Sequence, residues 1–192
     1  MIKDYITLCK PRISLLVVIT TLFSFIVAVG RAGLPLFYLL LGTGLASCAC
    51  GCLNQWLEIK QDGLMRRTAQ RPLPAARLQP RQALAFGVAL AASGLGLLAW
   101  KSNSLTLEIT TLTLALYLMI YTPLKMLTPH TTWIGAAAGA TPPLVGWAAA
   151  QGHLPAQAWV LFAIQFLWQI PHFLALFWMY REDYARAGFQ VM

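Results

Sequence analysis

Residues 34–62 read "LPLFYLLLGTGLASCACGCLNQWLEIKQD", an apolar block that runs into regularly spaced polar side chains. Residues 34–53 carry no charge, and about 20 apolar residues are enough for one helix to cross a bilayer. Asn54, Glu58 and Asp62 follow at intervals of four residues. The stretch therefore predicts a membrane-spanning helix that ends in a polar cluster at the membrane surface.

The rest of the chain repeats this apolar character. Of its 192 residues, 58% are hydrophobic and only 10% are charged, which favours an integral membrane protein over a soluble domain. Apolar blocks occur at residues 13–30, 34–53, 83–100, 104–121, 131–150 and 155–179. The alternating pattern of a membrane β-barrel is absent. We predict an all-α integral membrane protein, a single-domain helical bundle over residues 1–192 with about six transmembrane helices.

The distribution of positive charge predicts the orientation. With the N-terminus in the cytoplasm, the cytoplasmic segments would hold all 14 Lys and Arg residues except Arg31 and Lys101. This follows the positive-inside rule, so the net charge of +8 indicates contact with a lipid bilayer and not with nucleic acid. No cleavable signal or transit peptide precedes Pro11. We expect a multi-pass protein of the bacterial inner membrane, with its N-terminus and its polar face in the cytoplasm.

Asn54, Glu58 and Asp62 lie one helical turn apart. If their helix continues past Leu53, the three side chains project from one face. Oxygen ligands stacked at a helix end suit Mg²⁺, which takes one or two carboxylates together with water and phosphate oxygens. The alternative is a solvated helix end whose acids pair with neighbouring cations. Spacing alone leaves both interpretations open.

Arginines follow these acids closely, at Arg66, Arg67 and Arg71. Guanidinium groups beside metal-holding carboxylates make a receptor for a diphosphate, but the same arginines could serve only to determine topology. A second acidic pair, Glu182 and Asp183, is expected on the same side of the membrane. Its presence there favours a functional site.

His172 follows Pro171 inside the last apolar block. Ionisable groups at membrane depth are costly and usually face a cavity. Pro142 and Pro143 interrupt the fifth block, and broken backbone is tolerated where it lines a protein cavity. His172 is therefore either a ligand-facing residue or a core histidine with its hydrogen bonds satisfied.

Longer motifs resemble those of the UbiA-type intramembrane prenyltransferases. "NQWLEIKQDGLMRRTAQRPL" (54–73) is similar to the first signature of that family, Asn-x-x-x-Asp/Glu-x-x-x-Asp. Its continuation resembles the protohaem IX farnesyltransferase branch, as do "YTPLKMLTPHTTWIGAAAGATPPLVGW" (121–147), "WQIPHFLALFW" (168–178) and "REDYARAGFQVM" (181–192). The likeness runs through nearly the whole chain.

This resemblance implies Mg²⁺-dependent transfer of a farnesyl group from farnesyl diphosphate to a vinyl group of haem b. The product would be haem O, which a haem A synthase would take up. The resemblance assigns the metal and diphosphate to Asn54, Glu58, Asp62, Asp183 and Glu182, with Glu58, Asp62 and Asp183 as the metal ligands. It assigns neutralisation of the diphosphate to Arg66, Arg67, Arg71 and Lys125, and a haem contact to His172.

Members of this family are longer and have further membrane-spanning helices, so we expect the chain to hold the N-terminal two thirds of the fold. Two alternatives stay open. One is a prenyltransferase of the same fold that acts on an aromatic quinone precursor. The other is a non-catalytic haem-binding membrane protein or an inactive truncated relative, which would keep His172 but tolerate substitution of Glu58 and Asp62.

Overall fold

The computed structural model describes residues 1–29 and 33–190, so that Arg31 lies outside the described residues. Within these ranges every regular element is helical. The elements are α1 (Ile2–Leu8), α2 (Pro11–Val29), α3 (Leu34–Leu57), α4 (Ile59–Leu64), α5 (Pro80–Lys101), α6 (Ser104–Ala115), η1 (Leu116–Tyr121, a π-helical turn), α7 (Thr122–Leu124), α8 (Thr131–Gly139), α9 (Pro142–Gln151), α10 (Ala156–Met179) and α11 (Arg181–Arg186).

Among the described residues, five stretches are long and apolar enough to cross a membrane, namely α2, α3, α5, the continuous run Ser104–Leu124 and α10. The prediction of an all-α, multi-pass membrane bundle is confirmed. The predicted fifth span, 131–150, differs, because α8 ends at Gly139 and α9 begins at Pro142. Pro142 and Pro143 lack the N–H groups that would continue the ladder of α8, and they occupy the first turn of α9, where no donor is needed.

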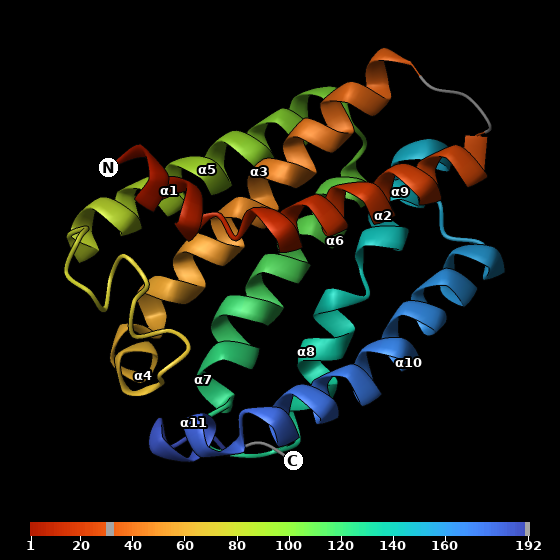
Figure 1. The fold of residues 1–192 in the computed structure, drawn as a ribbon. Helices are drawn as coiled ribbons and strands as arrows, with labels where there is room; N and C mark the ends of the chain where they lie inside the picture. The colour runs from red at the N-terminus through yellow and green to blue at the C-terminus, as the bar shows by residue number, and fades with distance from the viewer. Residues whose placement is uncertain (30–32, 191–192) are drawn as a thin grey trace.

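The helices pack around α3, which lies along α5 and is crossed by α2 (Figure 1). Helix α2 also packs against α9, while α10 covers α8 and α9. The short helices α4, α7 and α11 gather at one end of the bundle (Figure 1). We call this end, where the charged side chains described below meet, the polar end.

Small residues let α3 and α5 approach closely. A Cβ atom on Gly94 would lie 2.8 Å from the backbone nitrogen of Ala46 and 2.8 Å from the carbonyl oxygen of Gly42. Glycines at such crossings allow direct backbone contact between membrane helices. Beyond the crossing, Leu39 and Leu98 belong to a buried apolar cluster, so α3 is held firmly along its length.

A substitution at this crossing tests the packing. We expect Gly94→Ala to destabilise the protein by about 1–3 kcal/mol, because the added methyl group overlaps backbone atoms that cannot move aside. Gly96→Ala, two residues further along α5, is the matched control, since a Cβ there meets nothing within 4 Å. Thermal unfolding in detergent should give a lower midpoint for Gly94→Ala only. Equal midpoints for the two variants would contradict this account of the crossing.

Candidate functional site at the polar end of the bundle

Asn54, Glu58 and Asp62 lie in a row at the polar end of α3, and we call these three residues the acid row. The backbone N–H of Glu58 donates to the carbonyl of Asn54 at 3.0 Å, and that of Asp62 donates to the carbonyl of Glu58 at 2.8 Å. Helix α3 continues past Leu53, as predicted, but it ends at Leu57 and α4 begins at Ile59. The hydrogen bonds bridge this break, so the one-turn spacing of the three side chains is kept.

These three side chains are nearly inaccessible to water. Asn54 is 2% exposed, Glu58 7% and Asp62 1%. A buried carboxylate is stable only when it is paired and hydrogen-bonded. The site therefore has to supply a partner for each acid.

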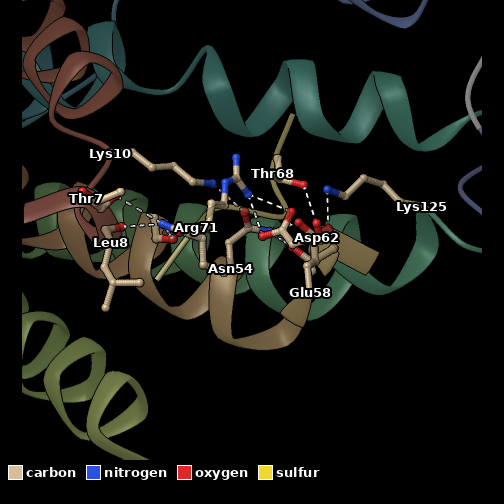
Figure 2. A network of polar contacts seen from close by, with 12 residues as sticks. Thr7, Leu8, Lys10, Asn54, Glu58, Asp62, Thr68, Arg71 and Lys125 are labelled. Carbon is tan, nitrogen blue, oxygen red and sulfur yellow. Dashed lines mark hydrogen bonds and ion pairs between the residues drawn. The ribbon is translucent and has the colours of Figure 1, made fainter. Parts of the chain in front are cut away.

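Cations from distant parts of the chain are those partners (Figure 2). Nη1 of Arg71 donates to both carboxylate oxygens of Asp62, at 2.8 and 2.7 Å. The Lys125 ammonium forms an ion pair with Glu58. The amide of Asn54 donates to the second oxygen of Glu58 at 2.9 Å. The Asp62–Arg71 pair is joined to these residues through the backbone bond from Asp62 to the carbonyl of Glu58, and together they form the acid–cation network.

Lys10 completes this network, although in the sequence it shows only as one of the cations on the predicted cytoplasmic side. Its Nζ atom donates to Oδ1 of Asn54 at 2.6 Å, from the side opposite Lys125 (Figure 2). Burial, and secondarily the charge of Arg71, lower the pKa of Lys10 to about 8. In the sequence, Lys10 directly precedes Pro11 at the start of an apolar block, and this position gives no sign of its contact with Asn54.

Asp183 lies at the N-terminal part of α11, against the loop that follows α4. Its oxygens accept hydrogen bonds from the backbone N–H groups of Arg66 and Arg67, at 3.2 Å each, and from Nη2 of Arg186 at 2.6 Å. Burial opposes ionisation of this acid, but the backbone donors and the arginines outweigh it and lower the pKa of Asp183. Asp183 thus fastens α11 to the loop that carries Arg71.

The other predicted site residues lie outside the acid row. The side chains of Arg66, Arg67 and Glu182 are exposed, and the Arg67 guanidinium lies 4.9 Å from the ring centre of Tyr180. His172 is exposed on α10 and stacks on Trp168, with ring centres 5.1 Å apart. His172 is therefore not part of the acid–cation network described above.

The predicted metal set of Glu58, Asp62 and Asp183 stays a prediction. Across residues 1–29 and 33–190, no three His, Cys, Asp or Glu side chains lie together closely enough to hold a metal ion. Glu58 and Asp62 are adjacent in the network, whereas Asp183 is engaged by the 66–67 backbone and Arg186. Each of the three acids is occupied by cations or N–H donors in this state.

An apolar chamber of about 150 Å³ adjoins the acid row, deeper within the bundle. Lys10, Gly51 and Tyr117 line it near the polar end, and Thr43 and Val145 line it further along their helices. The Tyr117 side chain comes from η1, and π-helical turns of this kind occur frequently at functional sites. The apolar chamber therefore lies next to the acid–cation network, with Lys10 belonging to both.

Removing one partner of a buried ion pair tests the network. We expect Arg71→Met to destabilise the protein by about 3 kcal/mol, because Asp62 would keep a buried charge without its cation. The double variant Asp62→Asn with Arg71→Met should recover part of that loss. Thermal unfolding in detergent measures both effects.

The ion pair between Arg77 and Asp4 is the matched control. Its Arg77 side chain is 44% exposed, so water can solvate Asp4 once the guanidinium is lost, and Arg77→Met should have a much smaller effect on the unfolding midpoint. If Arg77→Met and Arg71→Met lowered the midpoint equally, the buried network would not be the stabilising feature.

Known proteins resemble this chain in sequence and in fold. The model of the UbiA prenyltransferase family matches residues 17–192. The chain is 46% identical to "Protoheme IX farnesyltransferase" of Solibacter usitatus, covering 99% of this chain and 69% of that protein. It is 43% identical to the Opitutus terrae protein of the same name, covering 65% of it, and 43% identical to the human mitochondrial one, covering 42%.

The chain thus spans about two thirds of the length of the bacterial relatives and under half of the human one. A solved structure of a UbiA homologue from Archaeoglobus fulgidus, bound to DMAPP and Mg²⁺, has a TM-score of 0.83 at 17% identity. The match covers 98% of this chain and 68% of that one. The fold is therefore shared even where the sequences have diverged. Sequence and structure together show that the chain belongs to the UbiA prenyltransferase family.

Proposed function

We propose that this protein transfers a farnesyl group from farnesyl diphosphate to a vinyl group of haem b and so makes haem O. The observation that carries the prenyl transfer is the row of Asn54, Glu58 and Asp62 with its cations, one of which, Lys10, also lines an apolar chamber. The haem acceptor is supported by the similar proteins, which bear the name "Protoheme IX farnesyltransferase" in bacteria and mitochondria.

The donor set suits Mg²⁺. Glu58 and Asp62 offer carboxylate oxygens, and Asn54 offers an amide oxygen, all buried at one helix end; hard divalent cations take such oxygens together with phosphate and water. We propose that Glu58 and Asp62 hold the ion, with Asp183 contributing from α11. When bound, Mg²⁺ would supply positive charge to the departing diphosphate.

The cations of the network have two uses in this proposal. Before the substrate binds, Arg71 and Lys125 neutralise the buried acids. When a diphosphate is present, these cations can turn to its oxygens, joined by Arg66 and Arg67 from the neighbouring loop, and guanidinium groups match its geometry. The metal and the diphosphate would then bind together, because each frees partners for the other.

The chamber is suited to the rest of the reaction. A farnesyl chain is apolar and fits an apolar wall, while the allylic cation formed at its first carbon needs a site without water. The Tyr117 ring lines the chamber near the polar end and lies 4.9 Å from the ring of Tyr121, between centres. The faces of such rings stabilise cations.

The proposed reaction is balanced as follows. The carbon–oxygen bond of farnesyl diphosphate breaks, and both electrons leave with the diphosphate. The vinyl group of haem b forms the new carbon–carbon bond, which leaves a cation on the adjacent carbon. Water adds to that carbon and a proton is released.

We propose His172, beside Trp168 on α10, as a contact for haem.

We also propose a cellular setting. The helices form one domain in a bacterial inner membrane, with the polar end in the cytoplasm, in keeping with the bias of Lys and Arg toward that side. Farnesyl diphosphate is water-soluble at its charged end, so a polar end that faces the cytoplasm gives it direct access. The product, haem O, would be passed to a haem A synthase.

Cells that lack their own haem O synthase provide the test. We expect expression of this protein to yield farnesylated haem, detected by mass spectrometry of extracted haems. Asp62→Asn should lower the yield at least about 100-fold, because it removes a carboxylate that would hold Mg²⁺ at the diphosphate. Asp4→Asn, the same change at a surface acid paired with Arg77, is the matched control and should leave the yield unchanged. Membrane levels of each variant are compared by immunoblot.

Two results would change the proposal. Prenylated quinone precursors without any farnesylated haem would keep the prenyltransferase and replace the acceptor. Farnesylated haem at equal yield from the parent and Asp62→Asn would overturn the role of the acid row.

A further inference from the structure

Given the proposed function, the place where the chamber meets the acid row is where the reacting bond of the substrate would lie. In farnesyl diphosphate an apolar chain is joined to a charged group through a single carbon–oxygen bond, and that is the bond that breaks. The apolar chamber suits the chain, whereas Asn54, Glu58 and Asp62 with their cations suit the diphosphate. The breaking bond must therefore lie where the two regions meet.

Three cations contact the acid row, and Lys10 is the one at this border. It is part of the chamber wall, together with Cys50, Gly51 and Tyr117, and its Nζ atom lies 2.6 Å from Oδ1 of Asn54. Within the described chain, the wall of the chamber includes neither Arg71 nor Lys125. Those two pair with the acids themselves, Arg71 with Asp62 and Lys125 with Glu58.

The backbone around Lys10 is held in an unusual conformation. Lys10 has a φ of +47°, which non-glycine residues adopt rarely and which persists only when the surroundings enforce it. Nε2 of Gln55 donates to the carbonyl of Leu8 at 2.9 Å, and the Ser14 hydroxyl donates to the carbonyl of Cys9 at 2.9 Å. Gly51 allows close approach, since a Cβ there would lie 3.3 Å from Cγ of Lys10.

These contacts come from two different helices and hold the short link from Leu8 to Lys10. Gln55 and Gly51 belong to α3, and Ser14 belongs to α2, so both helices fix the short link between α1 and α2. Such strain is concentrated at functional sites. Here it fixes Lys10 next to Asn54.

We propose that Lys10 is a catalytic residue whose ammonium group donates a hydrogen bond to the oxygen between carbon and phosphorus as that bond breaks. Both bonding electrons pass to this oxygen, and the Lys10 N–H stabilises the charge that develops there. No proton needs to be transferred. Asn54, the present partner of Lys10, is then free to turn its amide oxygen toward the metal.

The first test is a direct contact measurement that is independent of the acceptor. Protein labelled with ¹⁵N-lysine is reconstituted in bilayers with Mg²⁺ and a farnesyl diphosphate analogue whose bridging oxygen is replaced by sulfur. Solid-state NMR then measures ¹⁵N–³¹P dephasing. We expect the α-phosphorus signal to be dephased by a lysine nitrogen, and this dephasing to be lost in Lys10→Met. Lys3→Met, at an exposed lysine of α1, is the matched control and should keep it.

The second test separates chemistry from binding. In single turnovers with haem b, we expect Lys10→Met to slow release of pyrophosphate about 100-fold, the usual effect of losing one donor aimed at developing charge. Calorimetry with inorganic pyrophosphate and Mg²⁺ should show less than a tenfold loss of affinity, and Lys10→Arg should restore part of the rate. Lys125→Met should have the opposite effect: it should weaken the binding of pyrophosphate more than it slows the release of pyrophosphate in a turnover.

The outcomes are distinguishable. A parent protein that does not bind the analogue overturns the proposed function and the role of Lys10 together. A parent that binds it, with α-phosphorus dephasing unchanged in Lys10→Met, overturns the role of Lys10 alone. Equal losses of rate and of pyrophosphate affinity, without rescue by Lys10→Arg, would make Lys10 a structural partner of Asn54.

Discussion

Burial of two carboxylates at the end of a membrane bundle requires a cation for each, and this requirement organises the polar end of the protein. Asp62 is 1% exposed and Glu58 7%, so neither can rely on water. Arg71 lies nine residues beyond Asp62 in the sequence, and the loop after α4 must fold back to bring it there. Two further sets of hydrogen bonds hold this loop in the folded-back position. The Thr68 hydroxyl donates to the carbonyl of Asp62, and the backbone N–H groups of residues 66 and 67 donate to Asp183.

Helix α3 carries both halves of the site on one face. Thr43, Ser47 and Cys50 line the apolar chamber, and Asn54 follows one turn further toward the polar end. A prenyl diphosphate has the same division between an apolar chain and a charged group. The close contact with α5 at Gly94 keeps α3, which carries the site, in place.

The sequence predicted much of this arrangement, and the reasons differ between residues. Asn54, Glu58 and Asp62 were identifiable because helical spacing is a local property. Arg71 was assigned to a diphosphate from its position beside the acids, and Lys125 by resemblance alone. The structure places both on the acid row. Lys10 was missed because its contact with Asn54 joins residues 44 positions apart. No pattern within the chain marks that contact. The fifth predicted span is divided into α8 and α9, at the two prolines identified from the sequence as an interruption.

What the sequence by itself determined was the membrane bundle, the helices that span it and the end at which charge collects, because hydropathy and charge are properties of the residues in order along the chain. Only the tertiary structure decided which cation meets which acid, that Asp183 binds the loop backbone, and that Lys10 stands between the chamber and the acid row. These depend on where helices cross. In a nearly dry environment every buried charge must find its partner wherever the packing brings one, and that partner is seldom a neighbour in sequence.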